Sequence, residues 1–418
     1  MPGAVRKSRV AVVSPFVDKQ HGTERRVTEW IAQLAATYEI HVYSQDVQDV
    51  DLTKVTWHRI PKFPGPHLLN YLWWFAVNRL WRAWDSRFRN LRSDLVYSPG
   101  INCLDADVMS VHIVFAQYVQ GIQASLKLSR NSILAWPRVI HRRLYYRLVR
   151  ALERRLYSPP GVPLVLIAKH TAAALEKYYG RREHLPVVYV GLDHAIFNPA
   201  RRTALREAAR DELGLAPDRF ALLLVGNDAR NKGLPVIVQA LRILRELPID
   251  LLVVSREDPA PHLMAARDAG LDGRMGFLPQ RSDVEFYYAA ADAYVGPSLE
   301  DTFAQPPAEA MACGLPVIVS ANNGTSEIIT DGADGLILNN PESAESLAAM
   351  IRMLYEHPEF AARLAAKAAE TARAYTWERN GRELTAIFED ILREKAPAAS
   401  ATLAGESGTG TIAAQKND

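Results

Sequence analysis

We place the chemistry of this chain in the stretch Pro297–Gly314, which reads Pro-Ser-Leu-Glu-Asp-Thr-Phe-Ala-Gln-Pro-Pro-Ala-Glu-Ala-Met-Ala-Cys-Gly. A run of small apolar residues, Ala289–Val295, precedes it and suits a helix end followed by a buried strand. Pro306 and Pro307 fit the first turn of a helix, where a missing N–H is tolerated. The final glycine fits the stop of that helix, and residues 315–320 resume as an apolar strand. The sequence therefore predicts a strand, a polar loop, a short helix and a second strand.

This loop and helix start combine two binding chemistries. Glu300, Asp301 and Glu309 supply carboxylates, which only accept hydrogen bonds when ionised and therefore suit the hydroxyls of a sugar. The unpaired backbone N–H groups at the helix start suit an anion such as phosphate. A polyhydroxylated ligand that carries phosphate would satisfy both. The alternative for Glu309 is that it only complements the helix dipole.

Length and composition indicate two domains, because 418 residues with 48% apolar character exceed one ordinary core. Residues 1–200 carry 27 Lys and Arg against 15 Asp and Glu, a net charge of +12, whereas residues 201–418 carry 22 against 32, a net charge of −10. This asymmetry indicates different partners for the two halves. Two cysteines, no apolar leader and no apolar run of membrane-spanning length predict a cytoplasmic protein.

The beginning of the chain favours a doubly wound α/β unit. An apolar strand starts at Arg9, and a loop containing Gly22 follows it. Helical spacing over Glu24–Tyr38 and a short strand at Ile40–Tyr43 complete the pattern. Gly22 lets the backbone approach a ligand closely. The absence of Gly-x-Gly-x-x-Gly after this strand counts against a nicotinamide dehydrogenase.

The second half opens with another buried strand, Phe220–Gly226, whose following loop carries Arg230 and Lys232. Ligands bind at the carboxyl ends of strands in open α/β sheets. Two cations there can neutralise a diphosphate and stabilise it as a leaving group. The alternative is that both are solvated loop residues. His, Cys and carboxylate residues show no metal-ligand spacing, so we expect no metal.

Two segments of the basic half are unusual. Residues 67–90 hold four tryptophans interleaved with arginines, and residues 138–155 carry seven arginines among aromatic residues and leucines. Such segments are typical of helices that lie on an anionic membrane surface. The alternatives are an amphipathic core helix for the first segment and a solvated face for the second. Nucleic acid is not expected as a partner, because no known binding motif accompanies the charge.

The central stretch, from Asp301 through Glu309 and on into Ala-Met-Ala-Cys-Gly-Leu-Pro-Val-Ile, resembles the glutamate-x7-glutamate region of retaining glycosyltransferases of family 4. The Val-Gly…Lys-Gly-Leu loop around Lys232 and the segment Tyr189–Pro199 are also similar to that family. Asp301 stands where the family usually has Glu, with Glu300 beside it. Ala304 replaces the usual glycine.

The resemblance implies the α/β GT-B architecture, with two Rossmann-like domains whose parallel sheets face a central cleft. We expect four parts, which are an acceptor-side domain, a nucleotide-sugar-binding domain, a helix that packs back on the first domain, and a disordered tail. Their predicted bounds are residues 1–195, 196–375, 376–395 and 396–418.

The resemblance also implies roles for individual residues. The catalytic set would be Asp301 at the transferred sugar, Glu309 at the ribose hydroxyls, and His112 at a strand end facing the donor sugar. A purely structural role is the alternative for His112. The diphosphate would contact Lys232, Arg230, Ala304, Gln305 and Gly22. Further nucleotide and sugar contacts would come from Glu300, Thr302, Phe303, Phe277 and Leu278, the last two with ordinary strand packing as the alternative.

The resemblance implies a retaining, metal-independent, hexosyltransferase-type glycosyltransferase. The resemblance implies transfer from a nucleoside-diphosphate sugar, which serves as co-substrate with no other cofactor, to a glycan or lipid-linked acceptor. Cell-envelope or exopolysaccharide-type glycan assembly is the expected context, with peripheral association at the inner face of the membrane as an open alternative to a purely cytoplasmic location. Two other functions stay open, a sugar-nucleotide epimerase of GT-B fold and a non-catalytic GT-B protein that binds nucleotide or membrane.

Overall fold

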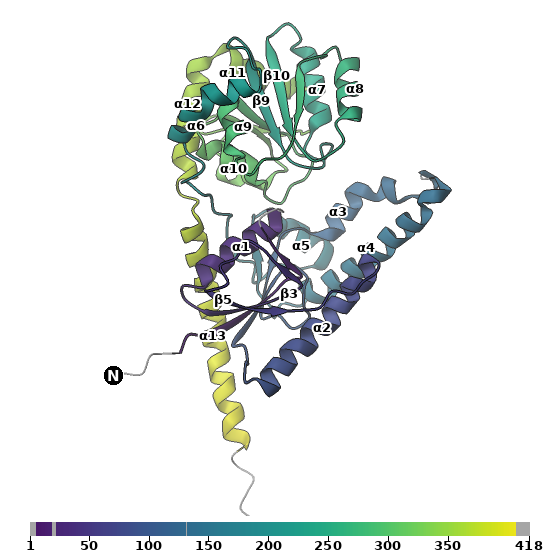
Figure 1. Ribbon diagram of the computed structural model, residues 1–418, viewed down its shortest axis with the longest axis vertical. Helices are drawn as coiled ribbons and strands as arrows, with labels where there is room; N and C mark the ends of the chain where they lie inside the picture. The colour runs from purple at the N-terminus through teal and green to yellow at the C-terminus, as the bar shows by residue number, and fades with distance from the viewer. Residues whose placement is uncertain (1–5, 19–21, 131, 407–418) are drawn as a thin grey trace, which may run out of the picture. The chain divides into compact units, whose positions relative to one another are not determined.

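The computed structural model describes residues 6–18, 22–130 and 132–406 (Figure 1). The chain divides into two compact units. The first unit comprises residues 1–110, 121–165 and 381–418, and the second comprises residues 111–120 and 166–380. Residues 166–195 thus group with the second unit, whereas the sequence predicts a domain boundary after residue 195. That boundary stays a prediction.

The first sheet has six strands in the order β5-β3-β1-β6-β7-β8. The pairings of β1 with β3 and β6, of β3 with β5, and of β6 with β7 are parallel. The strands form because short apolar, β-branched runs can be buried on both faces of a parallel sheet. Their bounds are β1 Arg9–Val13, β3 Glu39–Ser44, β5 Val55–Arg59, β6 Leu95–Pro99, β7 Val108–Val111 and β8 Leu164–Leu166. A separate two-stranded sheet pairs β2 (Phe16–Val17) with β4 (Asp46–Val47).

The N-terminal half of the chain also contains several helices. Their bounds are α1 Gly22–Leu34, α2 His67–Phe88, α3 Phe115–Ile122, α4 Trp136–Tyr157 and α5 Thr171–Tyr179, with short 3₁₀ turns at 123–126, 128–130 and 133–135. The C-terminal helix α13 (Trp377–Glu406) extends beyond Lys395, where the sequence predicts its end, and residues 407–418 of the predicted tail lie outside the described residues. In the first unit its Phe388 ring lies 6.0 Å from Tyr38 and 5.4 Å from Tyr97.

The second sheet also has six parallel strands, in the order β11-β10-β9-β12-β13-β14. Their bounds are β9 Phe220–Val225, β10 Ile249–Val254, β11 Met275–Leu278, β12 Ala293–Gly296, β13 Val317–Ser320 and β14 Leu336–Leu338. The strand order reverses between β9 and β12, which makes this junction a topological switch point. The strands predicted at residues 220–226 and 315–320 are confirmed as β9 and β13.

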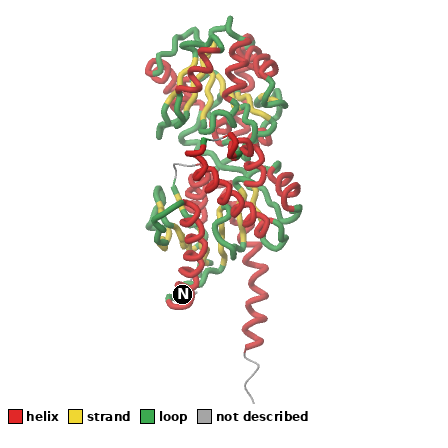
Figure 2. The backbone as a smooth tube through the Cα atoms, turned by 90° about the vertical axis from the view of Figure 1, so that its right-hand side faces the viewer, coloured by secondary structure: helices red, strands yellow, loops and turns green. Residues whose placement is uncertain are grey.

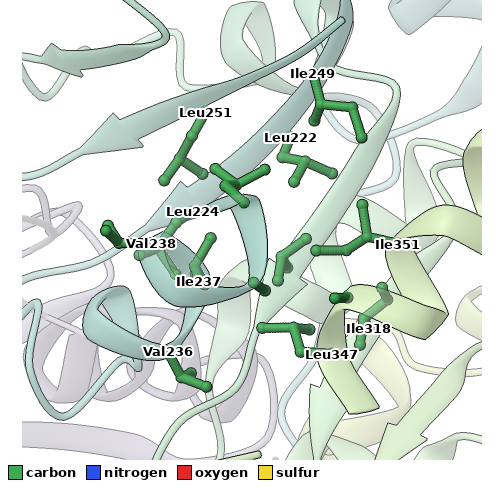
Figure 3. Close-up of a cluster of buried hydrophobic side chains, with 14 of the residues drawn as sticks. Leu222, Leu224, Val236, Ile237, Val238, Ile249, Leu251, Ile318, Leu347 and Ile351 are labelled. Atoms are coloured by element: carbon green, nitrogen blue, oxygen red, sulfur yellow. The ribbon is translucent and has the colours of Figure 1, made fainter. Parts of the chain in front are cut away.

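Helices lie on both sides of the strands in the second unit (Figure 2). Their bounds are α6 Pro199–Glu212, α7 Leu234–Ile243, α8 Ala260–Asp268, α9 Glu285–Ala290, α10 Gln305–Ala312, η4 Gly324–Ile328, α11 Ala344–Glu356 and α12 Pro358–Ala372. Leu222 and Leu251 of the sheet meet Ile237 of α7, and Leu347 and Ile351 of α11 join the same core (Figure 3). Each of these side chains is at most 1% exposed, and burying such a side chain contributes about 1.5–3 kcal/mol. This core holds the strand ends in place.

Among the described helices, none is both long enough and apolar enough to cross a membrane.

Candidate functional site

The candidate site lies at the switch point of the second sheet. The loop of residues 226–233 leaves the carboxyl end of β9, and the loop of residues 297–304 leaves the carboxyl end of the neighbouring β12. The first loop leads into α7 and the second into α10. Loops that diverge from adjacent parallel strands in this way form the usual ligand crevice of an open α/β sheet. The two stretches that the sequence analysis selected independently therefore meet at one sheet edge.

Direct bonds join these two loops. The backbone N–H of Leu299 donates to the carbonyl oxygen of Asn231 at 2.7 Å, and the Asn231 side-chain amide donates to the carbonyl oxygen of Glu300 at 2.8 Å. The Lys232 ammonium pairs with the carboxylate of Asp301. The structure thus brings together two predicted site residues, and it adds Asn231, which the sequence analysis did not select.

Two glycines make this close approach of the loops possible. Gly233 has φ +84°, a conformation that other residues adopt at a cost, and a Cβ there would lie 2.3 Å from the carbonyl oxygen of Pro297. Gly226 lies against the Lys232 side chain, because a Cβ built on it would lie 2.9 Å from Lys232 Cε. Gly226, directly after the strand, and Gly233, directly after the lysine, therefore hold the ammonium at the edge of the sheet.

The two basic residues of the first loop differ in their surroundings. The side chain of Lys232 is 18% exposed and that of Asp301 is 15% exposed, so water screens their attraction less than it would on an open surface. Arg230 is exposed. A diphosphate that binds Lys232 would have to compete with Asp301 for the ammonium.

Helix α10 has the predicted construction. It begins at Gln305 after an extended Ala304, and prolines occupy its first turn. At its end, Gly314 has φ +71° and donates its N–H to Met311, while Leu315 donates to Ala310, which is the Schellman pattern. The predicted helix and its glycine stop are confirmed.

The structure corrects the predicted role of the backbone N–H groups at the start of α10. The resemblance implies that Ala304 contacts the diphosphate, but its N–H donates to Asn323 Oδ1 at 3.3 Å. Asn323 also accepts the N–H of Thr325 at 3.0 Å, and the Thr325 hydroxyl donates to the carbonyl oxygen of Ala304. The side chain of Asn323 therefore already occupies one of the two predicted phosphate donors. Gln305 remains as the other.

Glu309 is a buried residue with an internal partner. It is 4% exposed, and its Oε2 accepts a hydrogen bond from the hydroxyl of Tyr288 at 2.8 Å. Burial, with the nearby Glu309 charge, raises the pKa of Tyr288 well above its ordinary value, so this hydroxyl stays a donor. The first turn of α10 holds no acidic residue, so Glu309 lies beyond the part of the helix where the dipole acts most strongly. Tyr288 fixes the orientation of the carboxylate.

Glu300 and a second, unselected glutamate lie near the start of α5. Burial raises the pKa of Glu300, while His170 and Gln117 act against that shift. Glu327 accepts the backbone N–H groups of Lys169 and His170, both at 2.7 Å, and the Tyr189 hydroxyl at 3.0 Å. Burial opposes the charge of Glu327, but these hydrogen bonds outweigh it and lower its pKa to about 2. Glu327 is thus an ionised anchor between η4 and the start of α5.

Gly324 packs directly against the loop between Asp301 and α10. A Cβ on Gly324 would lie 2.0 Å from the carbonyl oxygen of Thr302, so only glycine fits there. Phe303 is 2% exposed, and its ring centroid lies 6.3 Å from that of Tyr189. Phe303 is therefore a packing residue under the loop. The Asn-Gly pair at residues 323–324 was the signal in the sequence that could have identified this support.

The remaining predicted site residues lie elsewhere in the fold. His112 directly follows β7 and is buried. Gly22 is the first residue of α1 in the first unit, after residues 19–21, which lie outside the described ranges. Phe277 packs against the second core and stacks on His262, with ring centroids 5.5 Å apart, and Leu278 ends β11. For the Phe277 side chain, this supports the strand-packing alternative.

Within the described ranges, no group of three or more His, Cys, Asp or Glu residues could hold a metal ion, and metal independence stays a prediction.

Comparison with solved structures decides the fold. The chain superposes on WaaG, a glycosyltransferase involved in lipopolysaccharide biosynthesis, with a TM-score of 0.72 and 21% identity over 90% of this chain and 99% of WaaG. Sucrose-phosphate synthase from Thermosynechococcus elongatus superposes with a TM-score of 0.73 and 18% identity, over 93% of this chain and 100% of the synthase. The fold is GT-B. HepE from Anabaena, solved in complex with UDP-glucose, shares it with a TM-score of 0.68 and 17% identity over 91% and 99%.

Sequence comparison agrees with the GT-B fold in the second half of the chain. Residues 206–371 match the model of the family described as glycosyl transferases group 1. D-inositol 3-phosphate glycosyltransferase from an Arthrobacter species is 31% identical over 228 residues, which cover 51% of this chain and 52% of the relative. The same enzyme from a Nocardioides species is 32% identical over 222 residues, which cover 48% of this chain and 47% of the relative. The chain thus spans about half the length of these curated relatives.

Proposed function

We propose that the chain is a retaining glycosyltransferase that moves a sugar, as a hexosyltransferase of family 4 does, from a nucleoside-diphosphate sugar to a glycan or lipid-linked acceptor. The observation that carries the proposal is the pairing of Lys232 with Asp301 at the switch point of the second sheet. A cation beside a carboxylate suits a ligand that joins an anionic diphosphate to a polyhydroxylated sugar. The family match, the inositol 3-phosphate glycosyltransferases and the UDP-glucose complex of HepE support this choice of ligand.

In this proposal the residues of the two loops divide the donor between them. Lys232 and the N–H of Gln305 hold the diphosphate, with Arg230 available from the solvent side. Asp301 accepts hydrogen bonds from the transferred sugar once the diphosphate has taken its place on Lys232. Glu309, oriented by Tyr288, accepts from the ribose hydroxyls. His112 faces the donor sugar in the family 4 arrangement.

The chemistry follows from where charge develops. As the bond between the anomeric carbon and the diphosphate oxygen breaks, negative charge builds on the leaving phosphate, so a cation held there lowers the barrier. In the retaining reaction, the acceptor oxygen bonds to the anomeric carbon on the face that the diphosphate leaves. The acceptor proton passes to the departing phosphate oxygen. No metal or further cofactor enters this scheme.

A donor panel tests the proposal. The full chain is incubated with UDP-, GDP-, ADP- and dTDP-sugars, with and without glycan and lipid acceptors from a cell envelope, and products are identified by mass spectrometry. We expect release of one nucleoside diphosphate and a glycosylated acceptor, both lost in Lys232→Ala. An epimerised sugar nucleotide without transfer would instead identify an epimerase. Binding of nucleotide with no release from any donor would identify a non-catalytic protein.

A further inference from the structure

Helices α2 and α4 form one face of the first unit whose outer side chains are apolar or positively charged. The two helices pack on each other near their beginnings, where the N–H of Leu68 donates to His141 Nε2 at 3.3 Å. The ring centroids of Tyr71 and Tyr145 lie 5.5 Å apart at the same contact. Both helices lie along the same edge of this unit (Figure 1). We call their outward side the α2–α4 face.

The outward side of α2 is an unusually exposed apolar stripe. Trp74 is buried at 1% exposure, but Leu80 is 69% exposed, Trp84 56% and Phe88 65%. The rings of Trp84 and Phe88 contact each other, with centroids 4.3 Å apart. On α4, Ile140 and Leu144 are exposed in the same way. Single exposed apolar residues are common on protein surfaces, but a stripe of this length on one helix marks an interaction site.

The exposed charged residues that the two helices themselves carry have one sign. Each helix contains a single acidic residue, Asp85 in α2 and Glu153 in α4, and both are 0% exposed. Asp85 is bound internally by His58 and Tyr43. By contrast, all seven arginines of α4 are exposed. Every exposed Asp, Glu, Lys or Arg on the two helices is therefore an arginine.

We propose that the α2–α4 face docks the protein on an anionic lipid bilayer. Leucine and tryptophan side chains enter the boundary between headgroups and acyl chains, while arginines bind lipid phosphates with paired N–H groups. A second copy of the chain suits the face less well, because a two-fold contact would set one arginine-rich surface against another. Charged residues are also depleted in the cores of protein interfaces. The inference is independent of the proposed sugar transfer.

Vesicle sedimentation tests this surface with the full chain. Vesicles of phosphatidylcholine alone are compared with vesicles that also contain phosphatidylglycerol, at low and at high salt. We expect binding only to the anionic vesicles, and its loss at high salt as the charges are screened. Leu80→Glu with Trp84→Glu should weaken partitioning by roughly tenfold or more. Arg147→Gln with Arg154→Gln should weaken it about fivefold for each arginine removed.

The matched control is Leu263→Glu with Met264→Glu on α8 of the second unit, which changes two exposed apolar residues to the same charge. This control should bind vesicles like the unmodified chain, and circular dichroism should be unchanged in all variants because the altered side chains are exposed. Absence of binding to anionic vesicles at low salt, or equal binding by Leu80→Glu with Trp84→Glu, would overturn the proposal. A dimer in solution that the same pair of substitutions dissociates would assign the face to a second copy instead.

Discussion

Lys232 and Asp301 stand 69 residues apart in the chain and form an ion pair where the strand order of the second sheet reverses. Asn231 and Gly233 stand on either side of the lysine and hold its loop against the loop of Asp301. The side-chain amide of Asn231 donates a hydrogen bond to the carbonyl oxygen of Glu300, and Gly233 contacts Pro297 so closely that only glycine fits. The pair is therefore positioned by the backbone. Because Asp301 already binds the ammonium, a ligand anion must displace it, which makes the two residues separable in binding experiments.

Lys232→Ala should weaken the binding of the nucleoside diphosphate. Loss of a charge-assisted hydrogen bond is worth about 1.5–3 kcal/mol, which corresponds to a roughly 10- to 150-fold rise in Kd. Isothermal titration with the diphosphate identified by the donor panel measures this change. Lys367→Ala is the control, because Lys367 is an exposed lysine of α12 that also pairs with a carboxylate, Glu370. An unchanged Kd in Lys232→Ala would remove the lysine from the site.

Asp301→Asn should have the opposite effect on diphosphate binding. The substitution keeps the shape of the side chain but removes the charge that competes for Lys232, so the nucleoside diphosphate should bind at least as tightly as before. Sugar transfer should fall, because the carboxylate that accepts bonds from the sugar is lost. Parallel titration and rate measurements separate the two effects. Weaker diphosphate binding together with unchanged transfer would contradict this division of roles.

Glu309→Ala should reduce stability as well as activity, because it leaves the buried hydroxyl of Tyr288 without its acceptor. An unsatisfied buried hydroxyl costs about 1–3 kcal/mol. Glu309→Gln keeps an acceptor oxygen for Tyr288, so it should unfold close to the unmodified protein in urea while still losing transfer activity. Tyr288→Phe completes the set and should retain partial activity. Full activity in Glu309→Gln would show that the carboxylate charge has no part in the reaction.

Gly233→Ala should disrupt the site through the backbone. Gly332 offers a matched control, since it has φ +74° but no heavy atom within 4 Å of the added Cβ. Both substitutions carry the strain of a positive φ, about 1–2 kcal/mol. Only Gly233→Ala also places a methyl group against Pro297, so it should be the less stable by about 2 kcal/mol or more and should lose diphosphate binding. Equal stability of the two variants would contradict the described contact between the loops.

Acid should selectively weaken the anchor at Glu327. Its pKa of about 2 lies below the ordinary glutamate value, which means that the folded protein stabilises the ionised carboxylate over the protonated one. The resulting stabilisation, on the order of 3 kcal/mol, is present above about pH 4.5 and is lost as the pH falls toward 2. Urea unfolding across this window should show a shallower pH dependence for Glu327→Gln than for the unmodified chain. Identical slopes would mean that Glu327 does not gain these bonds on folding.

Local patterns in the sequence predict much of the second unit. β9 and β13 follow from short apolar runs, and α10 follows from its prolines and its terminal glycine, because these signals act within a few residues. The partners of the site residues come from farther along the chain. Asn323, which takes the N–H of Ala304, lies 19 residues away, and Tyr288 lies 21 residues from Glu309. Only the folded sheet brings these partners together. Local sequence patterns therefore do not predict that the N–H of Ala304 and the carboxylate of Glu309 already have partners inside the protein.

The basic helices show the same limit from the other side. The spacing of tryptophans and arginines in residues 67–90 predicts a helix, but it does not predict which side faces the core. The structure buries Trp74 and leaves Trp84 exposed, because packing against the sheet and against α4 selects one side of α2. The amphipathic-core alternative therefore describes the buried side of α2, and the exposed side is the one that the proposed membrane docking concerns.

We propose that the paired loops of the second unit bind the donor as an activated sugar. The most direct test is the rate of nucleoside diphosphate release from the panel of sugar nucleotides, compared between the unmodified chain and Lys232→Ala. We expect slow release from one donor even without acceptor, faster release with the acceptor, and a loss of at least tenfold in the release rate in Lys232→Ala. Release at the same rate by both proteins, or no release from any sugar nucleotide with any acceptor, would contradict this proposal.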